Sequence, residues 1–295
     1  MKLRIVEKRK IWFSLSVILV AASIIFMSFW GLKFGIDFTG GSLLEVNFNQ
    51  APVVSEVRSV MGDQYGHIIV QETGESSILL RLEDLSEAEH QAVLGLLSEN
   101  FGELDELRFD SIGPVIGQEL RRTATIGVIM TLLLIGLYVA AAFRKVSGDV
   151  PSWKYGVLTI VTAFHDVIIA VGAFAVLGHF FNWEVGTAFV AATLTILGYS
   201  INDTVVVFDR TRENLKDYVG DNLEETVNIS INQTFRRSLN TSVTTLLALA
   251  AILIFGGDTT KPFALALMIG IAVGTYSSLC LASPLLVAWE SRKRS

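Results

Sequence analysis

An aspartate lies within a stretch of sequence that otherwise has the composition of a membrane-spanning helix. The stretch covers residues 185–208, and Asp203 falls near its end in the run GYSINDT. An ionised carboxylate at mid-bilayer costs about 2.5–3.5 kcal/mol on translocon insertion scales, which cancels the contribution of roughly six Leu or Val residues. Ionisable residues kept at this cost usually serve ion or proton movement. Asp203 is therefore a candidate for proton exchange, and the alternative is a structural polar contact between helices.

A second apolar stretch, residues 156–180, carries an ionisable pair near its middle, His165 and Asp166. A helix rises 1.5 Å per residue, so Asp166 lies roughly 15 Å from the start of its span. Asp203 lies at a similar or slightly smaller distance from the end of its own span. We therefore expect the two carboxylates in one polar layer, with Asp166 as the second candidate.

Six apolar stretches must position these residues. Hydrophobic residues make up 51% of the chain, more than an ordinary soluble domain contains, and about 20 apolar residues cross a bilayer as a helix. The first stretch has too long an apolar core, and no small-residue cleavage site follows it, so we predict an uncleaved anchor and not a signal peptide. The fold class predicted is an α-helical membrane protein with six transmembrane helices. The stretches are 11–30, 125–143, 156–180, 185–208, 241–256 and 263–289.

Basic residues indicate how these spans are oriented. Lys and Arg are frequent before the first span, after the second and fourth spans, and in the C-terminal tail. In the short connections at 179–184 and 257–262, Lys261 is the only Lys or Arg. Because basic residues concentrate in cytoplasmic loops, we predict that the chain lies in the cytoplasmic (inner) membrane with both termini in the cytoplasm and residues 31–122 outside.

The chain is thereby divided into three parts. Residues 1–30 are the cytoplasmic N-terminus and first span, residues 31–122 form an outer domain, and residues 123–295 hold spans two to six with a cytoplasmic loop at 209–240. The outer domain has 16 acidic and 6 basic residues, a net charge of −10, against −6 for the whole chain. Such an acidic surface argues against nucleic acid as a partner.

The outer domain has the alternating pattern of a small α+β fold. Its second helix begins at a capping box formed by Ser86 and Glu89, and a turn is expected at 72–75. Strands are predicted at 42–48, 67–71, 78–82 and 104–111, and helices at 53–61 and from 86. The order βαββαβ is the ferredoxin-like split motif. Because the domain lacks a nucleophile elbow, metal-spaced histidines and an ATP motif, we expect a binding or mechanical module without enzymatic activity, cofactor or metal.

Two glycine-rich runs flank this domain. The first run precedes a strand instead of a helix and is not followed by a Walker lysine, so a tight backbone turn is favoured over a phosphate cradle. The second run contains Gly-Pro, which marks a sharp junction before the second span. The residues of the two runs are Gly35, Asp37, Phe38, Gly40, Gly41, Gly113, Pro114 and Gly117.

Small residues predict where the spans pack closely. In the sixth span, Gly270 and Gly274 form a GxxxG contact. In the fourth span, small residues repeat at spacings of three and four, which places them on one helix face. Because this face continues to Asp203, that side chain is expected to point at another helix instead of lipid. The small residues are Ala188, Ala191, Ala192, Thr195 and Gly198.

The segment after the fourth span has an apolar residue at every fourth position. We predict an amphipathic helix on the inner membrane surface, with Arg236 and Arg237 close to the cytoplasmic end of the span that carries Asp203. The alternative for these arginines is an attachment to anionic lipid. The apolar residues are Leu223, Val227, Ile231, Phe235 and Leu239.

Three motifs together resemble one protein family. The runs at 35–41, 113–117 and 198–210 are similar to those of the SecF branch of the SecD/SecF family, protein-export membrane subunits of the Sec pathway. The family belongs to the resistance-nodulation-division superfamily, whose members have two six-span halves, each with an outer domain after its first span. The resemblance implies that this chain supplies one half and SecD the other.

The resemblance also implies a function. Members are held to use the proton motive force to promote export through the SecYEG translocon, after the ATPase SecA has pushed the precursor. Asp203 matches the membrane carboxylate of the family and Arg237 the arginine before the fifth span, which implies a proton relay; Asp166 remains a second candidate. Further implied partners are YajC, YidC, unfolded precursor proteins and membrane lipid.

Two rival functions remain open. The chain could be half of a proton-driven small-molecule exporter of the same superfamily, although such a protein normally holds both halves in one chain and has a larger outer domain. It could also be a passive scaffold of the translocon, for which carboxylates within the membrane would be unnecessary.

Overall fold

A computed structural model describes residues 3–50, 52–66, 68–73, 76–144, 150–257 and 260–294. Residues 74–75 of the turn expected at 72–75 lie outside these ranges. The same holds for Lys2 and Lys145, two of the basic residues before the first span and after the second span. The chain divides into two compact units, one of residues 1–33 with 126–295 and one of residues 34–125. These divisions fall close to the boundaries expected at 31 and 122.

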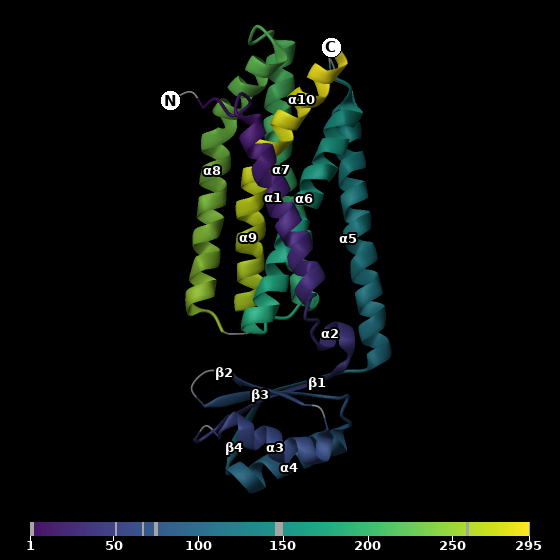
Figure 1. Ribbon diagram of the computed structural model, residues 1–295, viewed down its shortest axis with the longest axis vertical. Coiled ribbons are helices and arrows are strands. Elements are labelled where there is room, and N and C mark those ends of the chain that lie inside the picture. Colours follow the sequence, from purple (N-terminus) through teal and green to yellow (C-terminus); the bar gives the residue numbers. More distant parts are fainter. Residues whose placement is uncertain are drawn as a thin grey trace. The chain divides into compact units, whose positions relative to one another are not determined.

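Within the described ranges, six helices are long and apolar enough to cross a membrane, as predicted. Five are α1 (Arg9–Trp30), α5 (Pro114–Ala142), α6 (Ser152–Phe181), α7 (Thr187–Lys216) and α8 (Leu223–Phe255). The sixth span, Lys261–Ser291, consists of α9 (Lys261–Ser277), a π-helical turn η2 (Ser278–Ala282) and most of α10 (Ser283–Arg294). The start of α1 and the end of α10 lie at the same end of the helical unit (Figure 1).

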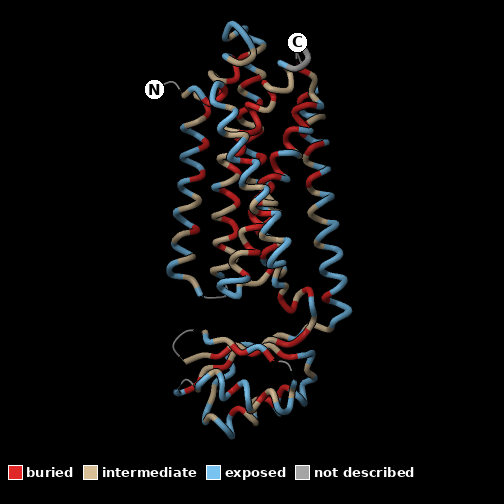
Figure 2. Tube along the Cα trace, in the orientation of Figure 1, coloured by how far each residue is buried: buried red, intermediate tan, exposed pale blue. Residues whose placement is uncertain are grey.

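Three of the spans form the centre of this unit. Half or more of the apolar stretch of α6, of α7 and of the sixth span is buried, against 17% or less in α1, α5 and α8. Accordingly, α5, at one side of the unit, is largely pale blue in Figure 2, and α8, at the other side, has its exposed residues mainly in its second half, 239–255. The central helices α6, α7 and α9 contact one another, α1 packs on α6, and α8 packs on α7 and α9.

The predicted close contact in the sixth span is confirmed. A Cβ atom added at Gly274 would lie 2.9 Å from Cβ of Ser200 on α7, and one added at Gly270 would overlap the side chain of Ile196. These glycines let the backbones of α7 and α9 approach each other more closely than larger residues would allow.

The predicted amphipathic surface helix is wrong. Residues 223–239 are the first half of α8, a continuous helix of 33 residues, and α7 runs to Lys216. Most of the segment at 209–240 is thus helical, and only residues 217–222 lie between α7 and α8. Val227 and Ile231 are fully buried in a cluster with Val207 and Val287. Most of the apolar stripe therefore packs against the chain's own helices, whereas Leu239 at its end is exposed.

The small-residue face of α7 also differs from the prediction. Only Ala192 of the five residues is buried, and a Cβ at Gly198 would have no neighbour within 4 Å. The faces of α7 that pack within the chain carry Ile196 and Ser200 instead, where α9 approaches. The helices of this unit therefore leave a stripe of α7 uncovered. The exposed residues of the stripe are Ala188, Ala191, Thr195 and Gly198, and it continues to Asn202.

The segment before α1 is attached to α8 by two side-chain amides. Asn232 Oδ1 accepts from Leu3 N (2.7 Å) and Asn232 Nδ2 donates to Leu3 O (2.8 Å). Asn228 Oδ1 accepts from Ile5 N (3.1 Å) and Val6 N (3.3 Å). The amides thus bond the backbone of this segment as a neighbouring strand would. Ile5 and Val6 are buried in the cluster of Val207 and Val287.

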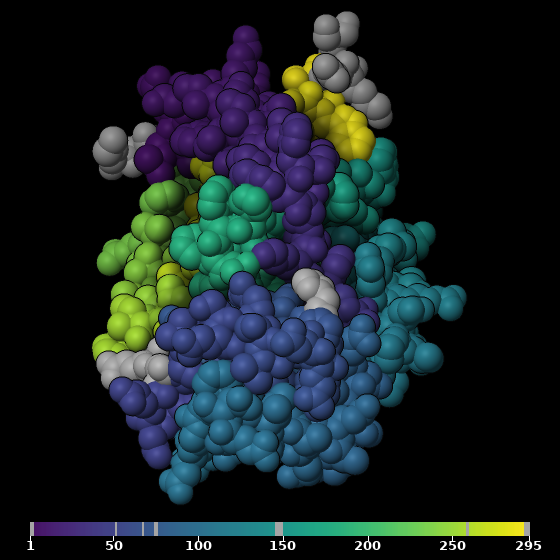
Figure 3. Space-filling view, turned by 60° about the horizontal axis from the view of Figure 1, so that its bottom comes forward, coloured from purple at the N-terminus to yellow at the C-terminus, as the bar shows by residue number. Residues whose placement is uncertain are grey.

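The unit of residues 34–125 has the predicted ferredoxin-like topology. Its antiparallel sheet has the order β2-β3-β1-β4, and one sheet face packs on α3 and α4. Alternate residues of β1, Leu44, Val46 and Phe48, are buried in this core. Figure 3 shows the surface of this unit in blue. The elements are α2 (Ile36–Thr39), β1 (Gly41–Phe48), α3 (Val54–Tyr65), β2 (Ile69–Thr73), β3 (Ser77–Leu82), α4 (Glu87–Phe101) and β4 (Leu104–Ile112).

The two glycine-rich runs meet each other in this unit. A Cβ at Gly40 would lie 2.7 Å from Cα of Pro114, and one at Gly117 would lie 2.9 Å from the backbone nitrogen of Gly40. Gly40 also has φ of 78°, which favours glycine. The one-turn helix α2 therefore packs backbone to backbone on the start of α5. The runs form a tight junction, as the preferred interpretation predicted.

Candidate functional site

Asp203 lies near the middle of α7, because this helix continues past residue 208. Its side chain is only 4% exposed and Ser238 of α8 is fully buried. The Ser238 hydroxyl and the charge of Arg237, also on α8, are close enough to act on the Asp203 carboxyl group. Neither Asp203 Oδ2 nor Ser238 Oγ has a hydrogen-bond partner among the described residues, so the two groups are neighbours without a formed bond.

This arrangement can convert proton binding into a change of helix contact. A carboxyl group loses its negative charge when it binds a proton, and its attraction to Arg237 is lost with that charge. In the low-dielectric interior of a membrane protein, this difference is larger than in water. The predicted orientation of Asp203 toward another helix is confirmed, and that helix is α8.

Asp166 is fully buried at the middle of α6, and both of its oxygens are bonded. Oδ2 accepts from the hydroxyls of Ser200 on α7 (2.5 Å) and Ser277 on α9 (2.7 Å). Oδ1 lies 2.8 Å from Nδ1 of His165. The carboxylate therefore joins the three central helices through donors that the chain itself supplies.

Four successive residues of the sixth span, 275–278, reach four different helices, because neighbouring residues of a helix point about 100° apart. This makes α9 the centre of the polar interior. The π-helical turn begins at the last of the four, and such turns are frequent at functional sites. The pairs are Thr275 with Ser242 of α8 (2.6 Å), Tyr276 with the Trp12 carbonyl of α1 (2.7 Å), Ser277 with Asp166 of α6 (2.7 Å) and Ser278 with Thr204 of α7 (2.8 Å).

The two carboxylates face different neighbours. Ser200 bonds Asp166 and lies one helical turn before Asp203, so the two carboxyl groups occupy adjacent turns of the interior. Asp166 faces α7 and α9, whereas Asp203 faces α8. The structure thus places the Asp203 carboxyl group beside Ser238 and within electrostatic range of Arg237, which is exposed, and it places Asp166 in a separate hydrogen-bonded cluster.

Sequence reasoning missed the hydroxyl residues. Two signals in the sequence point to these residues. Ser200 lies in the same motif as Asp203, and Ser277 follows Gly274 by three residues in the GxxxG helix. Ser238 is adjacent to Arg237, and a small hydroxyl beside the expected arginine was its only sign.

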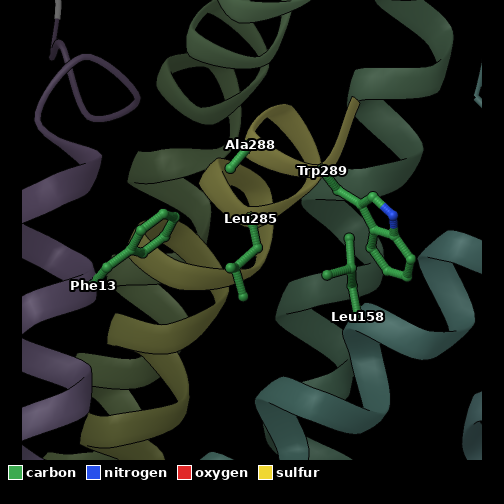
Figure 4. A pocket seen from close by; sticks show the side chains of 5 residues that line it. All are labelled: Phe13, Leu158, Leu285, Ala288 and Trp289. Carbon is green, nitrogen blue, oxygen red and sulfur yellow. The ribbon is translucent and has the colours of Figure 1, made fainter. Parts of the chain in front are cut away.

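A pocket of about 440 Å³ lies elsewhere in the helical unit and has a different character. Its lining comes from Phe13 of α1, Leu158 of α6, and Leu285, Ala288 and Trp289 of α10 (Figure 4). None of these side chains is ionisable. The pocket is therefore separate from both carboxylates and supplies no group for proton exchange.

Two family models match the chain. One, described as protein export membrane protein SecD/SecF, C-terminal, matches residues 93–292. The other, the SecD/SecF GG motif, matches residues 25–52 and so includes the first glycine-rich run.

Relatives and solved structures agree with these matches. The protein translocase subunits SecF of Thermobaculum terrenum and Anaerolinea thermophila are 40% and 38% identical, with 98% of this chain and 94% of each relative covered. The crystal structure of SecDF, a translocon-associated membrane protein from Thermus thermophilus, matches with a TM-score of 0.85 at 36% identity. The match covers 99% of this chain but only 39% of that one. The chain is a multi-pass membrane protein and belongs to the SecD/SecF family of protein-export membrane proteins.

Proposed function

We propose that this chain is the SecF-type half of a proton-driven unit that promotes protein export in the Sec pathway. Asp203 takes up and releases the proton, and Arg237 responds to its charge. The observation that supports this proposal is the buried Asp203 carboxyl group, with one oxygen unbonded, beside Ser238 and Arg237. A purely structural aspartate would be expected to have its oxygens satisfied, as Asp166 has.

The size of the driving force is sufficient for a two-state change. A proton that crosses 100 mV supplies about 2.3 kcal/mol, and each unit of pH difference adds about 1.4 kcal/mol. Shifting a conformational equilibrium from 1:10 to 10:1 takes about 2.7 kcal/mol by population arithmetic. One or two protons per cycle therefore suffice.

The complementary half is proposed to be SecD. Two observations support it: the α7 face of Ala191, Thr195 and Gly198 is exposed in this chain, and the solved SecDF chain is much longer than the part matched here. Small residues on one helix face allow close packing with another helix. In the resulting assembly, Asp203 and Arg237 would lie beside the interface between the halves, where transporters of this architecture place their sites.

The remaining assignments follow from the same proposal. The termini and the 217–222 connection face the cytoplasm, and residues 34–125 lie outside as a reversible clamp for unfolded precursor without enzymatic activity. The partners are SecD, the SecYEG translocon with YajC and YidC, and lipid of the inner membrane. The small-molecule exporter has less support, because the matched relatives are named translocase subunits.

The test compares two aspartates of the same helix. Asp203→Asn keeps the shape of the side chain and removes the proton site, so the variant should fold and bind SecD but lose the export that a proton gradient adds in vesicles. ATP-dependent translocation by SecA should persist. Asp209→Asn is the matched control, since its carboxylate is 58% exposed and six residues further along α7. Full stimulation by the gradient in Asp203→Asn would assign that residue a structural role.

A further inference from the structure

His165 combines a bonded ring nitrogen with an unbonded one. Nδ1 lies 2.8 Å from Oδ1 of Asp166, and Nε2 has no hydrogen-bond partner among the described residues although it is buried. The residue is 6% exposed. Buried polar atoms of proteins are nearly always bonded, so this free nitrogen requires an explanation.

The neighbours of Asp166 determine which nitrogen carries the hydrogen. Ser200 and Ser277 both donate to Oδ2, which is the pattern of a carboxylate that only accepts. Oδ1 is then also an acceptor, and Nδ1 of His165 is its donor. In the neutral ring, the lone pair is therefore on Nε2. A carboxylate that holds Nδ1–H in this way orients an imidazole so that Nε2 can take up a proton.

We propose that His165 and Asp166 form a second proton-accepting site of the membrane unit, at which Nε2 of His165 binds the proton. This inference rests on the proposed proton-driven function and adds to it a group that changes charge separately from Asp203. Histidine is the side chain that ordinarily changes charge near neutral pH. When Nε2 is protonated, the positive ring is compensated by the Asp166 carboxylate in contact with it.

Few other ionisable groups face this site, so its charge depends mainly on the pair itself. Residues 11–30 of α1 contain no Asp, Glu, Lys, Arg or His, and Asp203 is the only such residue at 187–208 of α7. The ring of Tyr276 lies 6.4 Å from that of His165, centroid to centroid. Within the apolar stretches around α6, the titratable groups are Asp203 and Tyr199 of α7, Tyr276 of α9, Cys280 of η2 and Tyr138 of α5. Two charged residues lie near the start of α6, Glu290 of α10, which is bound to Lys154, and Arg212 of α7, which acts on Tyr155.

Proton uptake at this site would act on the contact between α7 and α9. Ser200 donates to Asp166 and also packs against Gly274. A Cβ atom added at Gly274 would lie 2.9 Å from the Cβ atom of Ser200. A positive imidazole competes with the hydroxyls of Ser200 and Ser277 for the same carboxylate. Charging His165 therefore weakens the two bonds that hold α7 and α9 to α6.

The direct test reads the protonation of the ring. The chain, in complex with its complementary half in lipid vesicles, is labelled with ¹⁵N-histidine and followed by solid-state NMR as the pH is lowered. The chain has 4 histidines, and the signal lost in His165→Asn identifies the one of interest. We expect the Nδ1–H tautomer at high pH and an imidazolium at lower pH. A ring that stays neutral wherever the fold persists, or the opposite tautomer, overturns the proposal.

The functional test uses variants with matched shape. Asn at position 165 retains a donor near the place of Nδ1 but cannot take up a proton, so His165→Asn should lose most of the export that a proton gradient adds. His179→Asn, on an exposed histidine of the same helix, is the control and should export normally. A response of His165→Asn equal to that of His179→Asn overturns the role. Asp203→Asn is measured in parallel. If this variant exports normally, the proposed function is contradicted, whereas the NMR titration tests proton binding at His165 independently of export.

Discussion

The two units of the chain differ in where they place polar and apolar side chains. In residues 34–125, the core is formed by apolar residues such as Leu44 and Leu97. In the helical unit, Asp166 and its hydroxyl partners occupy the centre, while large apolar residues such as Leu247, 66% exposed, form the outside. The difference reflects the solvent: water rewards buried apolar surface, whereas hydrocarbon forces polar groups to find partners inside the protein. The same side chain therefore has a different energetic role in each unit.

The largest expected effect tests buried polar groups in the helical unit. Lys154 of α6, 1% exposed, forms an ion pair with Glu290 of α10, 13% exposed. Lys154→Met leaves Glu290 without a partner, and the loss of one member of a buried pair costs about 3–5 kcal/mol. The double variant with Glu290→Met should recover most of this loss. Thermal unfolding in detergent measures both, and a double variant as unstable as the single one would contradict the explanation.

The next prediction compares the same substitution, leucine to alanine, in each of the two units. Leu44→Ala removes a fully buried side chain from the core of residues 34–125 and should cost about 2–5 kcal/mol. Leu247→Ala truncates an exposed leucine of α8 and should change the stability in bilayers very little. Resistance to proteolysis in vesicles reports both. Equal losses would mean that the outside of α8 is a core surface.

Two glycines sharpen the comparison within the helical unit. Gly274→Val forces a branched side chain against Ser200 and should cost about 1–3 kcal/mol through overpacking. Gly198→Val points into open space, so the isolated chain should remain as stable as the wild type. The amount of SecD that co-purifies with the Gly198→Val variant should nevertheless fall if SecD covers the exposed α7 face. Thermal unfolding and co-purification separate the two effects; normal recovery of SecD would place the interface elsewhere.

The smallest effect concerns the capping box of α4, which the structure confirms. Ser86 accepts from Glu89 N (3.4 Å), and Glu89 accepts from Ser86 N (2.8 Å). Ser86→Ala should cost about 1 kcal/mol and increase hydrogen exchange in the first turn of α4. The amides at the end of α4 serve as the internal control, because they should exchange as in the wild type.

The capping box also predicts a pH dependence. Hydrogen bonds from the Ser86 side chain and backbone lower the pKa of Glu89 below its ordinary value. A lowered pKa stabilises the fold above the unfolded-state pKa, and this contribution disappears as the pH falls through the folded-state value. The protection of the amides at the start of α4, relative to their intrinsic exchange rate at each pH, should therefore fall in acid, and Glu89→Gln should remove that dependence. An unchanged dependence in Glu89→Gln would assign it to another group.

The regular elements were predictable because their signals are local. Six apolar stretches, the alternation in β1 and the capping box at Ser86 each depend on neighbours within one element, and all appear in the structure. The length of α7 was not predictable in this way. Asp209 and Arg210 end the apolar pattern, yet charged residues continue a helix readily once it extends beyond hydrocarbon.

Partners on other helices were the part that could not be predicted. Ser277 is one of many hydroxyl residues in the spans, and only the fold shows that it bonds Asp166. The stripe at Ala191 and Gly198 was recognised as a packing face, but its spacing does not say whether the neighbour belongs to the same chain. Asp203 is predictable because the free-energy cost of a carboxylate within an apolar stretch follows from the sequence alone.

The attachment of the N-terminal segment to α8 has a consequence for biosynthesis. Leu3 and Asn232 are separated by 229 positions, so a ribosome that adds 5–20 residues per second needs roughly 10–45 s between them. During that interval, the backbone groups of residues 3–6 have no amide to bond. This attachment can close only after the first half of α8 has been synthesised, and it is therefore a late step in the assembly of the newly made protein.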